Sequence, residues 1–269
     1  MKTRAITAFF FTIVMLGSIF LGGFTFTGFY LLLSLAALAE FYKLIRTSGV
    51  RPHQNLALVI AAGGFLGVGA SHFYALSPKY LLLLVPLVFA VFLSELYRQE
   101  KSPFSNIAYT FAGLIYVTVP FGFYYALGFL QDTQVYNFHL PLAFLLMLWA
   151  SDTGAYLFGR KLGAHKLFER HSPKKTWEGF FGGVLTSVLV GVAVSFLFRE
   201  MNMFCWAGMA VIIVCFGTLG DLVESMLKRS LGAKDSGTLL PGHGGLLDRF
   251  DGLLVAAPLV YVYLFLLLK

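Results

Sequence analysis

Charged side chains are scarce in this sequence: Asp, Glu, Lys and Arg make up 12% of its 269 residues, whereas 58% are hydrophobic and the mean hydropathy is +0.78. This composition excludes an ordinary soluble domain. The two cysteines, Cys205 and Cys215, fit neither a CxxC metal or redox motif nor an obvious disulfide pair. The motif GxxxxGK[ST] is absent, which excludes a P-loop phosphate site.

Long apolar runs dominate what is present, and each is close to the roughly 20 residues that a bilayer core requires. Nine such runs lie at about residues 5–21, 25–45, 55–76, 80–97, 105–128, 138–158, 176–198, 203–220 and 252–268. The first follows Lys2 and Arg4, as in a signal peptide, but no clear small-residue cleavage site precedes the second run. We therefore predict an all-α, polytopic integral membrane protein of about nine transmembrane helices.

The basic residues predict the orientation of these helices, because short cytoplasmic loops carry the excess of Lys and Arg. With a cytoplasmic N-terminus, the inner segments hold all but three of the 20 Lys and Arg residues, the exceptions being Lys79, Arg199 and Lys269. We expect the cytoplasmic membrane as the location. The net charge of +7 then reflects topology and anionic lipid headgroups, and no nucleic-acid partner is expected.

The chain divides by character into residues 1–150, a scaffold of transmembrane helices, and residues 151–269, a C-terminal transmembrane region rich in polar residues. In the scaffold, Glu40 and Glu95 each precede a base by three residues, which predicts i,i+3 ion pairs with Lys43 and Arg98.

Residues 151–269 concentrate charge, glycine and hydroxyl groups at the predicted cytoplasmic face. Asp152 lies at membrane depth near the inner end of the sixth run, and an ionisable residue there indicates a functional site. This site is thus predicted to face the cytoplasm.

Two adjacent lysines precede the seventh run. Ser172-Pro173 is a favourable start for a helix, which predicts Lys174 and Lys175 in its first turn. There they oppose the helix dipole by about 0.3–1 kcal/mol each. An anion bound at the helix N-terminus would remove that cost, so a phosphate site is one interpretation. Lysines that contact lipid headgroups are the other.

Acidic residues follow the eighth run and open the ninth. A polar stripe at i, i+3, i+4 and i+7 consists of Asp221, Glu224, Ser225 and Lys228. Asp248 and Asp251 likewise share a helix face. If the two faces meet, three or four carboxylates converge and require a cation, and carboxylates without Cys or clustered His favour Mg²⁺. The alternative places Asp248 in structural salt bridges with Arg249 or Lys234.

The glycine-rich segment Pro241–Gly245 separates these two helices. Its glycines tolerate positive φ and can present several amides to one anion, although a plain re-entrant turn would use them equally well. His243 could donate to a phosphate or satisfy the turn. A carboxylate metal site, several bases and these amides at one membrane face together indicate nucleotide or phosphoryl transfer to a lipid.

A pattern of 27 residues gathers these features. Its fixed positions are Ser225, Lys228, Arg229, Lys234, Asp235, Pro241, Gly242, His243, Gly244, Gly245, Asp248, Arg249 and Asp251. The pattern resembles the signature of the CTP:phosphatidate cytidylyltransferase (CDP-diacylglycerol synthase) family. The segments SDTGAY at 151–156 and SPKKTWEG at 172–179 also resemble that family.

The resemblance implies that a phosphatidate phosphate attacks the α-phosphate of CTP, which releases pyrophosphate and forms CDP-diacylglycerol with Mg²⁺ required. Asp221, Asp248 and Asp251 would hold the metal, and Lys228 and Arg249 would act with them in catalysis. The substrate-binding residues would be Asp152, Lys174, Lys175, Ser225, Arg229, Lys234, Gly242, His243 and Gly244. A second cation beside Mg²⁺ and a homodimer stay open, as does whether Asp152 completes the metal site instead.

Three other functions remain to be separated from this one. Two are CTP-dependent lipid enzymes, namely a cytidylyltransferase for isoprenoid-ether lipids and a polyprenol kinase. The third is an ion or phosphate transporter, but its site would lie near the bilayer midplane, whereas the charges here lie at one face.

Overall fold

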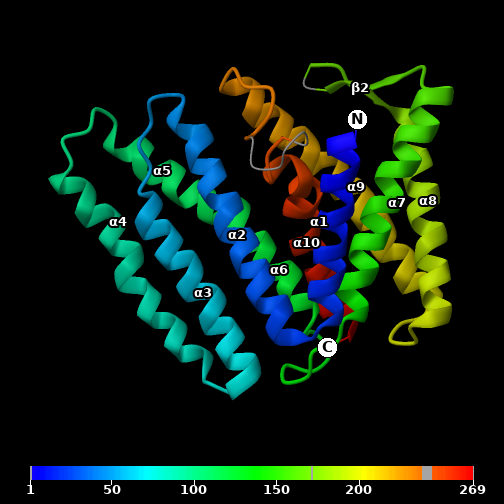
Figure 1. Cartoon of the computed structure of the whole chain (residues 1–269), viewed down its shortest axis with the longest axis horizontal. Coiled ribbons are helices and arrows are strands. Elements are labelled where there is room, and N and C mark those ends of the chain that lie inside the picture. Colours follow the sequence, from blue (N-terminus) through cyan, green and yellow to red (C-terminus); the bar gives the residue numbers. More distant parts are fainter. Residues whose placement is uncertain (1, 171, 238–243, 269) are drawn as a thin grey trace.

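The computed structural model describes residues 2–170, 172–237 and 244–268 (Figure 1). Its helices are α1 (Lys2–Phe20), α2 (Gly23–Arg46), α3 (Gln54–Tyr74), η1 (Pro78–Leu84), α4 (Val85–Tyr97), α5 (Pro103–Gly113), η2 (Leu114–Thr118), α6 (Val119–Leu127), α7 (His139–Leu162), α8 (Trp177–Leu197), α9 (Met203–Ser230) and α10 (Leu247–Leu268). Two short strands, β1 (Lys166–Phe168) and β2 (Ser172–Thr176), pair in antiparallel fashion between α7 and α8.

All nine predicted apolar runs are helical within the described ranges. Eight helical stretches are long and apolar enough to cross a membrane, and α1 contains a shorter apolar stretch, Phe9–Phe20. The fourth run joins η1 to α4, and the fifth runs through α5, the π-helical turn η2 and α6. The prediction of an all-α polytopic membrane protein is confirmed.

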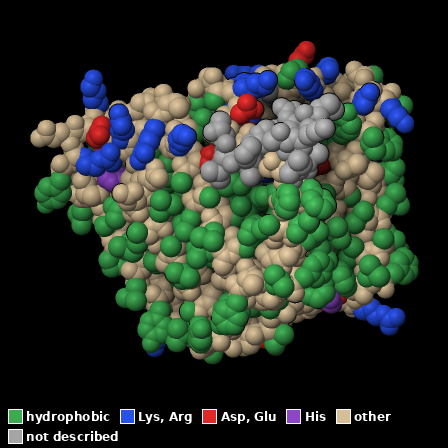
Figure 2. All heavy atoms as spheres, in the orientation of Figure 1, with side chains coloured by type: hydrophobic (Ala, Val, Ile, Leu, Met, Phe, Trp, Pro, Cys, Tyr) green, Lys and Arg blue, Asp and Glu red, His purple; other side chains and the backbone are tan. Residues whose placement is uncertain are grey.

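The helices run roughly alongside one another, with α3 and α4 at one side and α7 and α8 at the other (Figure 1). The N-terminus and the β1–β2 hairpin lie at one end of the bundle and the C-terminus at the opposite end. On the face in Figure 2, Lys and Arg side chains gather along the hairpin end above a broad hydrophobic belt. Lipid-facing surface and a charged end are therefore clearly separated.

Small residues bring α7 and α8 together. A Cβ on Gly154 would lie 2.0 Å from Thr186 Oγ1 and 2.7 Å from the Gly182 carbonyl oxygen, so the two helices touch backbone to backbone. The Thr186 hydroxyl also donates to the Ala150 carbonyl at 2.9 Å. Such close approach is how helices associate in lipid, where no hydrophobic force drives them together.

The start of the seventh span differs from the prediction. Ser172 to Thr176 form β2, and α8 begins at Trp177, with the Thr176 side chain accepting a hydrogen bond from the Gly179 amide at 3.2 Å. Pairing with β1 keeps Ser172 to Thr176 extended, and Thr176 caps the helix in place of Ser172. Lys174 and Lys175 therefore precede the helix and do not lie in its first turn.

Candidate active site

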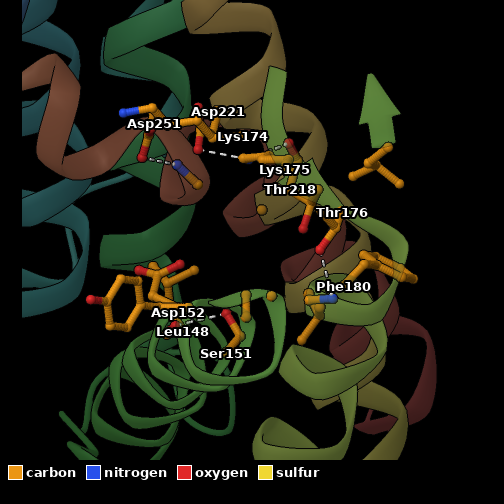
Figure 3. A pocket seen from close by; sticks show the side chains of 18 of the residues that line it. Leu148, Ser151, Asp152, Lys174, Lys175, Thr176, Phe180, Thr218, Asp221 and Asp251 are labelled. Atoms are coloured by element: carbon orange, nitrogen blue, oxygen red, sulfur yellow. Dashed lines mark hydrogen bonds and ion pairs between the residues drawn. The ribbon is translucent and has the colours of Figure 1, made fainter. Parts of the chain in front are cut away.

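A cavity of about 430 Å³ lies among α7, β2, α8, α9 and α10 (Figure 3). Its charged lining residues are Asp152, Arg160, Lys174, Lys175, Asp221, Arg249 and Asp251. The rest of the wall is mostly small or apolar, including Trp149 and Phe180. Acids, bases and apolar surface thus meet at the charged end of the bundle, which suits a ligand with both phosphate and lipid parts.

The close approach of α9 to α10 places two of the acids side by side. A Cβ on Gly220 would lie only 2.3 Å from the Asp251 carbonyl oxygen, and one on Gly252 would lie 3.5 Å from the Gly217 Cα. Asp221 and Asp251, each next to one of these glycines, consequently face the same cavity (Figure 3). The two acidic helix faces, whose meeting was a condition of the sequence-based interpretation, thus meet at this pair.

Asp221 is held by a lysine from β2. Lys175 Nζ lies 2.6 Å from Asp221 Oδ2 and donates to the Thr218 carbonyl at 3.4 Å (Figure 3). The Ser225 hydroxyl donates to the other oxygen of Asp221 at 3.2 Å. The predicted substrate-binding residues Lys175 and Ser225 therefore both contact Asp221, one across the cavity and one along α9.

Asp152 stands where two cavities meet. Together with Arg249 and Asp251 it lines the larger cavity and also a smaller one of about 240 Å³. The rest of the smaller cavity combines apolar residues, such as Phe11 and Met15 of α1, with threonines and one further acid, Asp248. These three charged residues therefore lie between the cavity that contains the lysines and the cavity that α1 borders.

Asp248 belongs to a different set of contacts. Its Oδ1 lies 2.5 Å from Lys228 Nζ, and its Oδ2 accepts from the Ser236 amide at 3.0 Å, the Ser236 hydroxyl at 2.9 Å and the Gly245 amide at 2.9 Å. Lys228 Nζ also lies 2.5 Å from Glu224 Oε2. Asp248 borders the smaller cavity and is absent from the lining of the larger. Its metal-ligand role stays a prediction. The salt bridge with Lys228 is of the kind that the alternative interpretation placed with Arg249 or Lys234.

The other predicted residues lie in varied positions. Arg229 donates to the Ala233 carbonyl at 3.2 Å beyond the end of α9, and Lys234 is exposed nearby. Neither lines the larger cavity. Gly244 has φ +82°, the left-handed region, and a Cβ there would lie 2.8 Å from Asp248 Oδ2. Gly242 and His243 lie outside the described residues.

Residue patterns missed the role of Glu40. The expected ion pair with Lys43 is wrong: the Glu40 carboxylate is buried and accepts from the Ser236 hydroxyl and the Leu246 and Leu247 amides, while Lys43 is exposed. A charged side chain buried in a membrane protein needs such hydrogen-bond partners. In the sequence, only the position of Glu40 within an apolar run indicated that it has them. The predicted pair of Glu95 with Arg98 is confirmed at 3.1 Å.

A metal at this site would draw on few protein ligands. Across the described ranges, no group of three or more His, Cys, Asp and Glu residues is arranged to hold an ion by itself. Asp221 and Asp251 nevertheless offer carboxylate oxygens to one cavity. Mg²⁺ commonly uses one or two carboxylates and takes its remaining ligands from substrate phosphates and water, so this donor set fits Mg²⁺ bound together with a nucleotide.

Comparison with known proteins supplies independent information. A family model described as "Cytidylyltransferase family" matches residues 2–267. The chain is 37% identical to a phosphatidate cytidylyltransferase of Staphylococcus haemolyticus, across 98% of this chain and 99% of that one. It is 36% identical to the phosphatidate cytidylyltransferases of Staphylococcus aureus and Staphylococcus epidermidis, over the same shares. The similarity therefore includes the N-terminal helices as well as the polar C-terminal region.

Proposed function

Because the chain belongs to the cytidylyltransferase family, we propose that it transfers the cytidylyl group of CTP to phosphatidate, forming CDP-diacylglycerol and pyrophosphate. The observation that carries the proposal is the larger cavity, in which acids and bases lie at the charged end of apolar helices. A nucleotide could reach this end from water, while the acceptor stays in the lipid. The names of the three relatives support phosphatidate as that acceptor.

The reaction forms one P–O bond and breaks another. A phosphate oxygen of phosphatidate attacks the α-phosphorus of CTP, and the bond from that phosphorus to the β-phosphate bridging oxygen breaks. The attacking phosphate is already ionised near neutral pH, so no side chain has to remove a proton. Catalysis by this chain is then positioning and electrostatic stabilisation.

The bases of the cavity suit the charge that develops. Arg160, Lys174 and Lys175 line the larger cavity only and would bind the triphosphate and the departing pyrophosphate. Arg249 borders both cavities and can contact the phosphates of either substrate. Apolar residues of the smaller cavity, such as Phe11 and Met15, would receive part of an acyl chain.

We also propose Mg²⁺ as the cofactor, with Asp221 and Asp251 as its protein ligands. Bound there, Mg²⁺ would offset negative charge on the triphosphate. Lys175 would keep the Asp221 carboxylate oriented toward the cavity. The gathering of Lys and Arg at this end supports a site that faces the cytoplasm from the inner membrane.

The test is pyrophosphate release by purified protein in mixed micelles that contain CTP, with phosphatidate and Mg²⁺ added or omitted. Asp251→Asn is the test variant. Asp132→Asn is its matched control, because Asp132 is an exposed loop residue before α7 that lies outside both cavities and whose carboxylate accepts a hydrogen bond from the nearby Gln134 backbone N–H. We expect release that requires both additions, persists in Asp132→Asn and falls at least 100-fold in folded Asp251→Asn.

Other outcomes would select a different function. Release with an isoprenoid-ether phosphate but not with phosphatidate would indicate the ether-lipid enzyme. CDP formed from CTP and polyprenol would indicate the kinase. Ion or phosphate flux into liposomes without any CTP turnover would overturn the transferase and restore the transporter.

A further inference from the structure

A buried carboxylate of the N-terminal scaffold reaches the start of the last helix. Glu40 lies in α2 and is 7% exposed. Its Oε1 accepts from the Ser236 hydroxyl at 2.7 Å and from the Leu247 amide at 3.0 Å, and its Oε2 accepts from the Leu246 amide at 3.0 Å. Both carboxylate oxygens are therefore engaged by residues about 200 positions later in the chain.

These contacts cap α10 from a different helix. The first amides of a helix have no acceptor within it and form the positive end of the helix dipole. The Leu246 and Leu247 amides lie at that position, since α10 begins at Leu247. A carboxylate suits the position for both reasons, so Glu40 fixes where the first turn of α10 begins.

The fit around the carboxylate is tight. A Cβ on Gly245 would lie 2.1 Å from Glu40 Oε1, and one on Gly237 would lie 2.6 Å from Oε2. Each glycine leaves the space that the carboxylate occupies. The contact thus belongs to a closely packed junction of α2 with the segments on either side of residues 238–243.

The junction leads directly to the candidate active site. The Ser236 hydroxyl lies 2.7 Å from Glu40 Oε1 and 2.9 Å from Asp248 Oδ2, and it donates its single proton to one of them at a time. Asp248 in turn contacts Lys228 of α9. Within the first turn and a half of α10, Arg249 and Asp251 enter the larger cavity. A displaced α10 start would therefore displace both.

We propose that Glu40 is a positioning residue for catalysis: by capping α10 and holding Ser236, it sets the placement of Arg249 and Asp251 relative to bound substrate. It does not line either cavity and contacts no reacting group. The kinetic part of this inference rests on the proposed transferase activity. It gives the N-terminal helices a role in the reaction beyond anchoring the protein.

The test compares Glu40→Gln with Glu95→Gln. Glu95 is a matched control because it is also a buried scaffold glutamate, 4% exposed, but its partners His53, Arg98 and Asn106 all belong to the N-terminal half. Both variants should lose thermal stability. We expect kcat to fall at least tenfold in Glu40→Gln with the KM for CTP within threefold of wild type, because orientation of bound substrate is lost. In Glu95→Gln both constants should stay within twofold.

Hydrogen exchange gives a readout that needs no turnover. Amides of residues 244–250 should exchange faster in Glu40→Gln than in wild type, and at the wild-type rate in Glu95→Gln. If the wild type proves inactive, the proposed function fails, and this exchange result alone decides whether Glu40 positions α10. Equal exchange in both variants would overturn the inference.

Ser236→Ala guards against a Glu40 variant that fails to fold. It should show faster exchange over the same segment and a lower kcat. Combined with Glu40→Gln, its effect on kcat should be smaller than the product of the single effects, since both act through one contact. Three results would each contradict the proposal. They are multiplicative effects of the two substitutions on kcat, a kcat within twofold of wild type in folded Glu40→Gln, and a loss of kcat in Glu95→Gln as large as that in Glu40→Gln.

Discussion

Lys175 Nζ lies 2.6 Å from Asp221 Oδ2 and so joins β2 to α9 across the wall of the larger cavity. An unpaired carboxylate there would repel a triphosphate, whereas a lysine beside it reduces that repulsion. Both side chains remain partly exposed, at 25% for Lys175 and 37% for Asp221. The lysine is therefore accessible to the phosphate oxygens of a nucleotide in the cavity while it stays beside Asp221.

Replacing Lys175 should reduce stabilisation of the transition state more than it reduces the stability of the fold. We expect Lys175→Gln to lower kcat/KM for CTP roughly 100-fold, which corresponds to about 2.7 kcal/mol, the size found when one preorganised donor is removed. Lys79→Gln is the matched control, because Lys79 is exposed in η1, outside both cavities. Steady-state kinetics in mixed micelles measure both, and a loss under threefold in Lys175→Gln would exclude a phosphate contact.

Asp248→Asn tests a residue with two candidate roles. We expect turnover to be abolished in a folded, detergent-extractable protein, because the change weakens the contacts with Lys228 and Ser236. Titration of residual activity with Mg²⁺ then separates the roles. A midpoint shifted to higher Mg²⁺ would support the ligand role, while an unchanged midpoint would assign Asp248 to the ordering of the segment before α10. Turnover at the wild-type rate at every Mg²⁺ concentration would count against both.

Gly220→Ala tests the contact of α9 with α10. The new Cβ would lie 2.3 Å from the Asp251 carbonyl oxygen, so the helices must separate. We expect a loss of about 1–3 kcal/mol of stability, as for other overpacked sites, together with reduced turnover. Gly122→Ala in α6 is the control, since nothing lies within 4 Å of its added Cβ and alanine favours a helix. In detergent, the unfolding temperature should fall below that of wild type for Gly220→Ala and rise above it for Gly122→Ala.

The sequence was sufficient for the helices but not for all of the site. Apolar runs of spanning length located each membrane helix, because the bilayer imposes length and hydrophobicity directly. The i,i+3 spacings of Asp221 with Glu224 and of Asp248 with Asp251 also predicted which acids share a helix face, since helix periodicity fixes which side chains lie on one side. Both predictions depend only on neighbours in sequence.

Contacts between distant segments could not be obtained in that way. Glu40 and Leu247 are separated by 207 residues, and their hydrogen bond depends on how α2 packs against the start of α10. The sequence indicated Lys43 as the partner of Glu40 only because the two residues are close in sequence. Likewise, Ser172-Pro173 has the residues of a helix start, but strand pairing of Lys166 with Thr176 took precedence. Tertiary packing decided each case.

The far end of the bundle provides a prediction on pH. Glu200, in the connection between α8 and α9, accepts hydrogen bonds from the ring of His139 and from the Asn137 amide. Burial raises the pKa of Glu200, but these hydrogen bonds outweigh it, and the net pKa lies below the usual value. A lowered folded-state pKa means that the ionised carboxylate stabilises the fold above the unfolded-state pKa of about 4.3, and that this contribution disappears as pH falls through the folded value. We therefore expect wild type to unfold at a higher temperature than Glu200→Gln at pH 7, and the difference to shrink below about pH 4.5. A difference that is as large at a pH well below the folded-state pKa as it is at pH 7 would show that the ionised carboxylate does not contribute.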